Sequence, residues 1–402
     1  MHAMSRQLLQ IDEPAAAGPR PFALWRLGFR PFYLLGALFA AVGVPVWVAV
    51  FSGGLTLPEG LPARTWHVHE MVFGFALAII VGFLFTAVRN WTNQPTPTGA
   101  PLAGLCALWL AARVAYVAGA SGLGLLIELA FLAWVAAALF RALLRARNRR
   151  NYFVGVLIAV LALADLLFWA AAQGHVPSVD PDAVLRFALY LISLLTFVIG
   201  GRVIPMFTAN VVRGLKQFKD ARLDRAAIGV AALAFALELS GVSGVGLALV
   251  AALAALLHAV RLAGWGPQGT WKHPLLWILH LSYGWAVLGF LLMAAAAMGW
   301  APRTLAVHAF ALGLVGGLII GMITRTALGH TGRMLVAGRA ETAMYVLVQL
   351  AALLRVFGPL AWPEHSLRFI EVSSVLWALA FVLYLLAYWP ILSRARIDGR
   401  DG

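Results

Sequence analysis

Histidine is the residue type in this sequence that points most directly to chemistry. Imidazole nitrogens ligate haem iron, copper and other transition metals. In lipid, an ionisable side chain is costly unless it is paired or functional. Five of the ten histidines lie within long apolar stretches or at their edges: His67, His69, His280, His308 and His330. These five are the candidate metal ligands. The other five are interpreted as solvated or interfacial side chains: His2, His175, His258, His273 and His365.

The first three candidates suit a haem site. His67 and His69 open one apolar stretch together with Glu70, and His308 opens another. On a regular helix, side chains two residues apart point about 200° apart, so His67 and His69 cannot both face one partner. Either of them, together with His308, can hold a haem between facing helices, and Glu70 can fix the tautomer of a ligand imidazole. The alternative is a set of polar side chains at the lipid–water boundary, with Glu70 paired to Arg64.

Two other histidines, His280 and His330, are predicted to lie near the opposite membrane face. Copper favours imidazole, so this pair is a candidate copper site. Hydrogen bonds to helix-end carbonyls are the alternative. Arg202 and Arg325 also lie within apolar stretches. A guanidinium at that depth needs an anion, such as a haem propionate, a carboxylate or a lipid phosphate.

The elements that position these residues are predicted from composition. Apolar residues make up 62% of the 402 residues and charged residues 11%, which is too apolar for a soluble domain. A helix needs about 20 apolar residues to cross a bilayer. Stretches of that length predict an all-α, polytopic bundle of about twelve transmembrane helices, at 31–51, 67–88, 101–119, 123–144, 152–173, 184–208, 226–241, 245–264, 275–299, 304–327, 341–360 and 370–392.

The second and tenth stretches are predicted to lie at the centre of the bundle. Small residues recur every fourth position in both, and such residues let membrane helices approach closely. Short matches at the ends of the second, sixth and tenth stretches favour three four-helix units. We expect a single transmembrane domain over 31–392, preceded by a cytoplasmic tail and interfacial anchor (1–30) and followed by a cytoplasmic tail (393–402).

The net charge of +14 follows membrane topology. Basic residues concentrate after the fourth, sixth and twelfth stretches, at 141–150, 213–225 and 394–400. This positive-inside pattern places both termini in the cytoplasm and makes the lipid bilayer, not nucleic acid, the expected partner. The single cysteine, Cys106, excludes an intramolecular disulfide and thiolate metal clusters.

Six segments carry a resemblance to a known family: FRPFY at 29–33, HVHEMVFGF at 67–75, GFLFTAVRNWT at 82–92, GRVIPMFTAN at 201–210, HLSYGW at 280–285 and LGHTGR at 328–333. These motifs resemble the NnrS family. The resemblance implies a twelve-helix protein of the bacterial inner membrane that contains haem b and copper. It also implies a role in the nitric oxide response, nitrosative-stress defence and denitrification. The ligand pattern is also similar to that of the haem–copper oxidases. Here, however, the sixth and seventh stretches carry no histidine, which argues against an oxidase-type binuclear centre.

Two functions remain open from the sequence. The first is a haem- and copper-binding redox protein that acts on nitric oxide or exchanges electrons with a small redox partner. His67, His69 and His308 would then be the haem ligands, Glu70 would orient one of them, and Arg202 and Arg325 would balance charge. The second is a metal-free, proton-coupled or anion transporter, because twelve helices with buried arginines also suit a substrate pathway.

Overall fold

The protein is helical throughout the described residues. The computed structural model describes residues 21–56 and 62–400, and these form helices and no strands apart from an isolated bridge between Phe22 and Arg394. The prediction of an all-α polytopic membrane bundle is confirmed. The α-helices are α1 (Phe29–Phe51), α2 (Ala63–His69), α3 (Leu77–Thr92), α4 (Gly99–Val117), α5 (Ser121–Arg145), α6 (Tyr152–Ala172), α7 (Pro181–Val211), α8 (Ala221–Leu239), α9 (Val245–Gly264), α10 (Pro274–Ala297), α11 (Arg303–His308), α12 (Gly317–His330), α13 (Arg339–Ala361) and α14 (Ser366–Leu392).

Two of the membrane helices contain a π-helical segment. The segment η1 (Glu70–Ala76) joins α2 to α3, and η4 (Ala309–Gly316) joins α11 to α12. Three short 3-10 turns complete the described structure: η2 (Arg149–Asn151), η3 (Pro267–Gly269) and η5 (Pro363–His365). Counting α2–η1–α3 and α11–η4–α12 as one helix each, the described residues form the twelve long helices expected from the sequence.

Eleven helices within the described residues are long and apolar enough to cross a membrane. They satisfy their own backbone hydrogen bonds, as a span in lipid must. The remaining long helix is α8, whose 19 residues carry four charged side chains. It packs between α7 and α9, and its buried Glu238 pairs with Arg186 and Arg303. The other three charges, on Arg222, Asp224 and Arg225, lie in the first turns of α8, so charge rather than length distinguishes this helix from the others.

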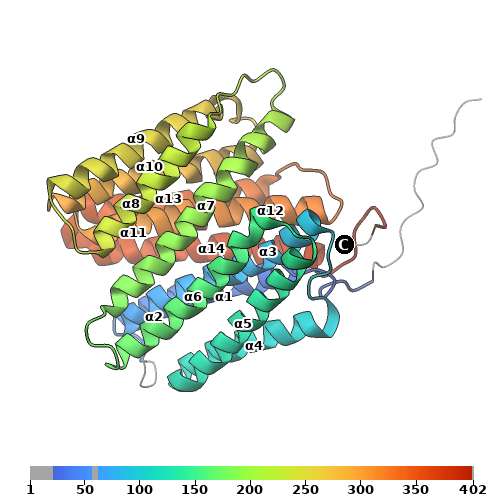
Figure 1. The fold of residues 1–402 in the computed structure, drawn as a ribbon, viewed down its shortest axis with the longest axis horizontal. Coiled ribbons are helices and arrows are strands. Elements are labelled where there is room, and N and C mark those ends of the chain that lie inside the picture. The colour runs from blue at the N-terminus through green and yellow to red at the C-terminus, as the bar shows by residue number, and fades with distance from the viewer. Residues whose placement is uncertain (1–20, 57–61, 401–402) are drawn as a thin grey trace, which may run out of the picture.

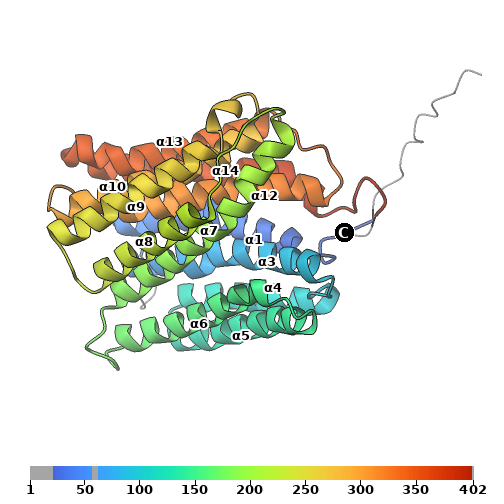
Figure 2. The same ribbon diagram turned by 45° about the horizontal axis from the view of Figure 1, so that its top comes forward.

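The helices pack largely in chain order (Figures 1 and 2). Helices α4, α5 and α6 follow α2–η1–α3 and form one layer in Figure 2. Helices α7 to α10 form the next group, and α11–η4–α12, α13 and α14 the third. The last helix, α14, packs along α1 and so joins the two ends of the chain. Helix α1, which packs against α14, adjoins this third group. The division into three four-helix units stays a prediction.

The π-containing helices lie at the centre, as expected from their small residues. The segment η1 contacts α1 and α7, and η4 contacts α7, α10 and α13. The α2–η1–α3 helix lies close to α1 at Gly82, where an added Cβ would lie 2.8 Å from the Cβ of Phe32. We call the end of the bundle where α2 and α11 begin the α2 end. Both described termini lie at the opposite end.

The segment before α1 is tied to the end of α14. Arg30 is buried, and its Nη1 donates hydrogen bonds to the carbonyl oxygens of Leu392 and Arg394, each at 2.8 Å. The backbone N–H of Ala23 donates to the carbonyl of Ser393. Within the predicted tail and anchor, residues 1–20, which include His2, lie outside the described residues. The described part of the anchor is thus fixed to the opposite terminus.

Candidate functional site

The candidate histidines lie where α-helix gives way to π-helix. Helix α2 ends at His69 and helix α11 ends at His308, and a π-helical segment follows each directly. Such segments are rare and often occur at functional sites. The two helices share this change of helical form at the α2 end of the bundle, so the structure brings the two groups of histidines to the same depth.

His67 and His308 line one cavity at the α2 end. The cavity has a volume of about 120 Å³. Its remaining walls are almost entirely apolar and come from α1, η1, α7, η4, α13 and α14. Arg355 of α13 is the one other ionisable side chain in the lining. Imidazoles from two separate helices therefore face a common apolar space.

The two imidazoles of this cavity are held in different ways. Nδ1 of His308 lies 2.8 Å from the carbonyl oxygen of Thr304, one turn earlier, and donates a hydrogen bond to it. This contact assigns the proton of the neutral ring to Nδ1 and leaves Nε2 as the ligating nitrogen. The ring of His67 stacks on the indole of Trp47, and its Nδ1 is buried without a hydrogen-bond partner. Both rings thus keep a nitrogen available to a metal.

A second cavity adjoins the first on the outer side. It has a volume of about 610 Å³ and shares seven lining residues with the apolar cavity, including His67, His308 and Arg355. Three further arginines line it: Arg64, Arg186 and Arg303. The two histidines therefore stand at the boundary between an apolar space and an arginine-lined one.

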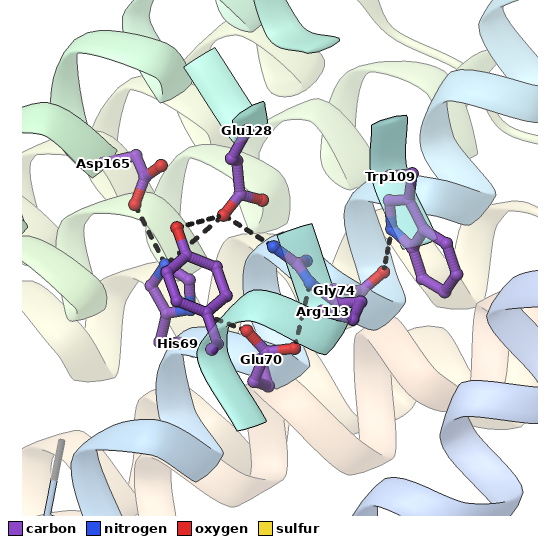
Figure 3. A network of polar contacts seen from close by, with 8 residues as sticks. His69, Glu70, Gly74, Trp109, Arg113, Glu128 and Asp165 are labelled. Atoms are coloured by element: carbon purple, nitrogen blue, oxygen red, sulfur yellow. Dashed lines mark hydrogen bonds and ion pairs between the residues drawn. The ribbon is translucent and has the colours of Figure 1, made fainter. Parts of the chain in front are cut away.

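His69 faces away from this cavity and belongs to a buried polar cluster (Figure 3). Its Nδ1 lies 3.0 Å from Oε1 of Glu70, and its Nε2 lies 2.9 Å from Oδ1 of Asp165 on α6. Nη2 of Arg113 on α4 lies 2.6 Å from Oε2 of Glu128 on α5, and Nε of Arg113 lies 3.2 Å from Oε2 of Glu70. We call these five side chains the carboxylate cluster. All are buried.

Two aromatic side chains complete the surroundings of the carboxylate cluster. The Tyr116 hydroxyl donates to Oε2 of Glu128 at 2.9 Å. Nε1 of Trp109 donates to the carbonyl of Gly74, within η1, at 3.1 Å (Figure 3). A Cβ at Gly74 would lie 2.9 Å from Oε2 of Glu70, so glycine leaves room for that carboxylate. Glu70 pairs with Arg113 in this cluster, whereas Arg64 pairs with Asp182, so the alternative pairing of Glu70 with Arg64 is wrong.

The structure holds His280 and His330 through separate contacts. Nε2 of His280 lies 2.8 Å from Oγ1 of Thr208, and its Nδ1 is buried without a partner. The ring of His330 lies 5.5 Å from that of Phe29. Within residues 21–56 and 62–400, the side chains of His69, Glu128 and Asp165 form the one group of three that lies close enough to share a metal ion. Copper at His280 and His330 stays a prediction.

The two arginines singled out in the sequence lie apart from both cavities. Arg202 is exposed, with its guanidinium over the ring of Phe153 and Nη1 3.4 Å from Oδ1 of Asn151. Arg325 is buried, with its guanidinium 4.0 Å from the centroid of Phe207. Neither lines the space beside His67 and His308. Of the arginines that line the two cavities, Arg355 of α13 is the one that lines both.

Sequence reasoning missed several buried polar residues. These include Arg113 and Glu128, as well as Arg355 in the lining of the apolar cavity. A carboxylate in the apolar run LLIELAF was the available signal for Glu128. The interpretation of His258 as an interfacial side chain is wrong, because it is fully buried and its Nδ1 lies 2.7 Å from the Tyr283 hydroxyl. Tyr283 also accepts a hydrogen bond from Nη1 of Arg261.

Comparison with known proteins agrees with the motifs. The sequence profile of the family described as NnrS protein matches residues 23–396, nearly the whole chain. No curated protein shows significant similarity to it. The match covers all the helices and both groups of candidate ligands. The chain therefore belongs to the NnrS family.

Proposed function

We propose that this protein binds haem b in the membrane as part of the nitric oxide response, with His67 of α2 and His308 of α11 as the iron ligands. The observation that carries the proposal is their shared cavity, because imidazoles from two separate helices line it together. The NnrS family, with its link to haem, metal and nitric oxide, supports the same conclusion. Bacterial inner-membrane placement with cytoplasmic termini belongs to this proposal.

The surroundings of the two histidines fit haem b in polarity. A haem has an apolar macrocycle and two carboxylate side chains at one edge. The inner cavity matches the macrocycle in polarity, since its walls are apolar, and at about 120 Å³ it would have to widen to admit it. The outer cavity would take the carboxylates, since Arg355 lines both cavities and guanidinium groups pair well with carboxylates.

The chain's own groups would set the properties of the site. Thr304 would orient His308 through its carbonyl oxygen, and Trp47 would hold the plane of His67. The apolar walls would exclude water from the inner face. When bound, haem supplies an iron that in its ferrous form binds nitric oxide or passes an electron to it. Two imidazole ligands favour a low-spin iron suited to electron transfer.

The absorption spectrum of protein purified from haem-replete cells tests the proposal. We expect a low-spin, six-coordinate haem in the unchanged protein. His67→Ala and His308→Ala should each lose haem or convert it to a high-spin form. His280→Ala is the matched control, since His280 is buried in a different part of the bundle, and its spectrum should not change.

A further variant decides between the two histidines of α2. His69→Gln keeps a hydrogen-bonding side chain in the carboxylate cluster and should leave the low-spin spectrum intact. A spectrum that changes in His69→Gln and not in His67→Ala would contradict the assignment. A colourless protein that is folded and monodisperse would contradict haem binding altogether and favour a transporter.

A further inference from the structure

We propose that the carboxylate cluster binds one divalent transition-metal ion, with His69, Glu128 and Asp165 as its ligands. This site is separate from the cavity that His67 and His308 line, and it does not depend on haem. The three side chains come from α2, α5 and α6, and one ligand atom from each lies within 4.8 Å of the other two. An imidazole nitrogen with carboxylate oxygens is a common ligand set for zinc and similar ions.

The orientation of His69 fits that role. Its Nδ1 faces Oε1 of Glu70, and its Nε2 faces both Asp165 and Glu128, at 2.9 and 3.8 Å. Metal-bound histidines almost always donate their other ring N–H to a carboxylate or carbonyl, which fixes the tautomer. Glu70 occupies that position here, so Nε2 is the nitrogen directed at the two remaining carboxylates.

Charge balance supports a divalent ion. The cluster has three carboxylates, on Glu70, Glu128 and Asp165, and one guanidinium, on Arg113. Beside a neutral imidazole this leaves two negative charges, all of them buried. Isolated buried charge is very costly in a low-dielectric interior. One divalent ion neutralises the cluster, and the competing arrangement requires two extra protons, one on the ring and one on a carboxyl group.

The carboxylates also have unused capacity. Oδ2 of Asp165 and Oε1 of Glu128 are buried and have no hydrogen-bond partner. Buried polar atoms in native structures are almost always satisfied by protein, water or an ion. The hydrogen bonds within the cluster thus leave two carboxylate oxygens for a further partner.

A polar cavity lies near the cluster at the α2 end. It has a volume of about 620 Å³ and is lined by Thr65, Ser121, Gln173 and Asp180, among others, and by Trp169. The Trp169 ring lies 5.7 Å from that of His69 and stacks on Tyr116. A cation in this polar space is therefore separated from the cluster by a pair of aromatic side chains.

Zinc binding to the full-length protein tests the proposal. The protein is purified with a histidine-free tag, stripped with a chelator, dialysed against Zn²⁺ and analysed for metal by mass spectrometry. We expect one Zn²⁺ per chain. Asp165→Asn and Glu128→Gln should weaken binding by at least about tenfold, and Glu70→Gln by about 10- to 100-fold. Glu238→Gln, which changes a buried carboxylate paired with arginines elsewhere, should bind normally.

X-ray absorption of the zinc-loaded, unchanged protein gives a readout that does not depend on how the variants fold. We expect nitrogen and oxygen ligands at about 2.0–2.2 Å and the outer-shell scattering of a single imidazole. Folded protein that retains no Zn²⁺ after the dialysis would overturn the proposal in favour of the protonated cluster. So would sulfur ligands, several imidazoles, or full affinity in Asp165→Asn and Glu128→Gln. The Soret band, recorded on the same samples, reports the haem proposal separately.

Discussion

The imidazole of His67 lies nearly parallel to the indole of Trp47, with ring centroids 4.0 Å apart and 20° between the ring planes. Both rings line the apolar cavity that His308 also faces. An aromatic pair of this kind contributes about 0.5–1.5 kcal/mol beyond the burial of its area. Trp47 therefore fixes the plane in which His67 can approach a metal.

Removal of that stacking partner should loosen haem binding. We expect Trp47→Leu to weaken haem affinity by roughly two- to tenfold. Without the stacking partner, the His67 ring can adopt several orientations, and binding would then have to restrict it to one. The measurement is the rate at which haem transfers from the purified protein to excess apomyoglobin. Trp300→Leu changes an exposed tryptophan and should transfer haem at the unchanged rate. Equal rates for Trp47→Leu and the unchanged protein would show that stacking does not hold the ligand.

The position of Arg355 predicts a role in binding a carboxylate-bearing ligand. A hydrogen bond to a charged group contributes about 1.5–3 kcal/mol, so Arg355→Gln should lower haem affinity by about tenfold or more. Arg202→Gln is the informative control, because Arg202 lies on neither cavity. Haem titration of the two variants measures the difference. A larger loss of haem affinity in Arg202→Gln than in Arg355→Gln would support the sequence-based expectation that Arg202 balances the charge of haem.

Loss of the arginine in the carboxylate cluster should lower the stability of the protein, and loss of a partner carboxylate should restore part of it. Arg113→Gln removes the guanidinium that pairs with Glu70 and Glu128. Breaking a buried pair typically costs about 3–5 kcal/mol because the remaining charge has no partner.

Adding Glu128→Gln to Arg113→Gln restores the original net charge, so the double variant should be more stable than Arg113→Gln alone. Thermal unfolding in detergent, analysed as a double-mutant cycle, measures the coupling. Additive losses would show that the two side chains do not act as a pair.

A glycine on α7 is required by an arginine on α9. A Cβ at Gly201 would clash with Nη2 of Arg261. Arg261 bonds to Asp224, to the Tyr283 hydroxyl and to the Phe197 carbonyl, so its displacement would disturb three helices. We expect Gly201→Ala to lower the unfolding free energy by about 1–3 kcal/mol, the usual cost of overpacking. Gly229→Ala, where an added Cβ meets nothing, should melt as the unchanged protein does.

Much of the fold could be predicted because the bilayer limits the choices. A chain that must satisfy its backbone in lipid forms helices of one approximate length, so the apolar stretches located nearly every span. Helical geometry also separated His67 from His69, and the structure turns them to different sites. Which of the two would face His308 could not be predicted, because helix packing and the π-helical segment η1 set the rotation of that helix.

Long-range polar pairing was the part that sequence reasoning could not reach. The contact of Asp165 with His69 joins residues 96 positions apart. Arg113 of α4 likewise pairs with two carboxylates, and both lie on other helices. Residue spacing along one helix shows which side chains share a face of that helix. Which residue of another helix they contact depends on how the helices pack.

The pairing of α1 with α14 has a consequence for biosynthesis. Helix α1 emerges from the ribosome first, yet the carbonyls that Arg30 binds belong to residues 392 and 394. Until α14 has been synthesised, Arg30 cannot make these two hydrogen bonds, and the flank of α1 that packs against α14 stays against lipid. The contact between α1 and α14 therefore forms late in biosynthesis, and a chain truncated before the last helix would lack it.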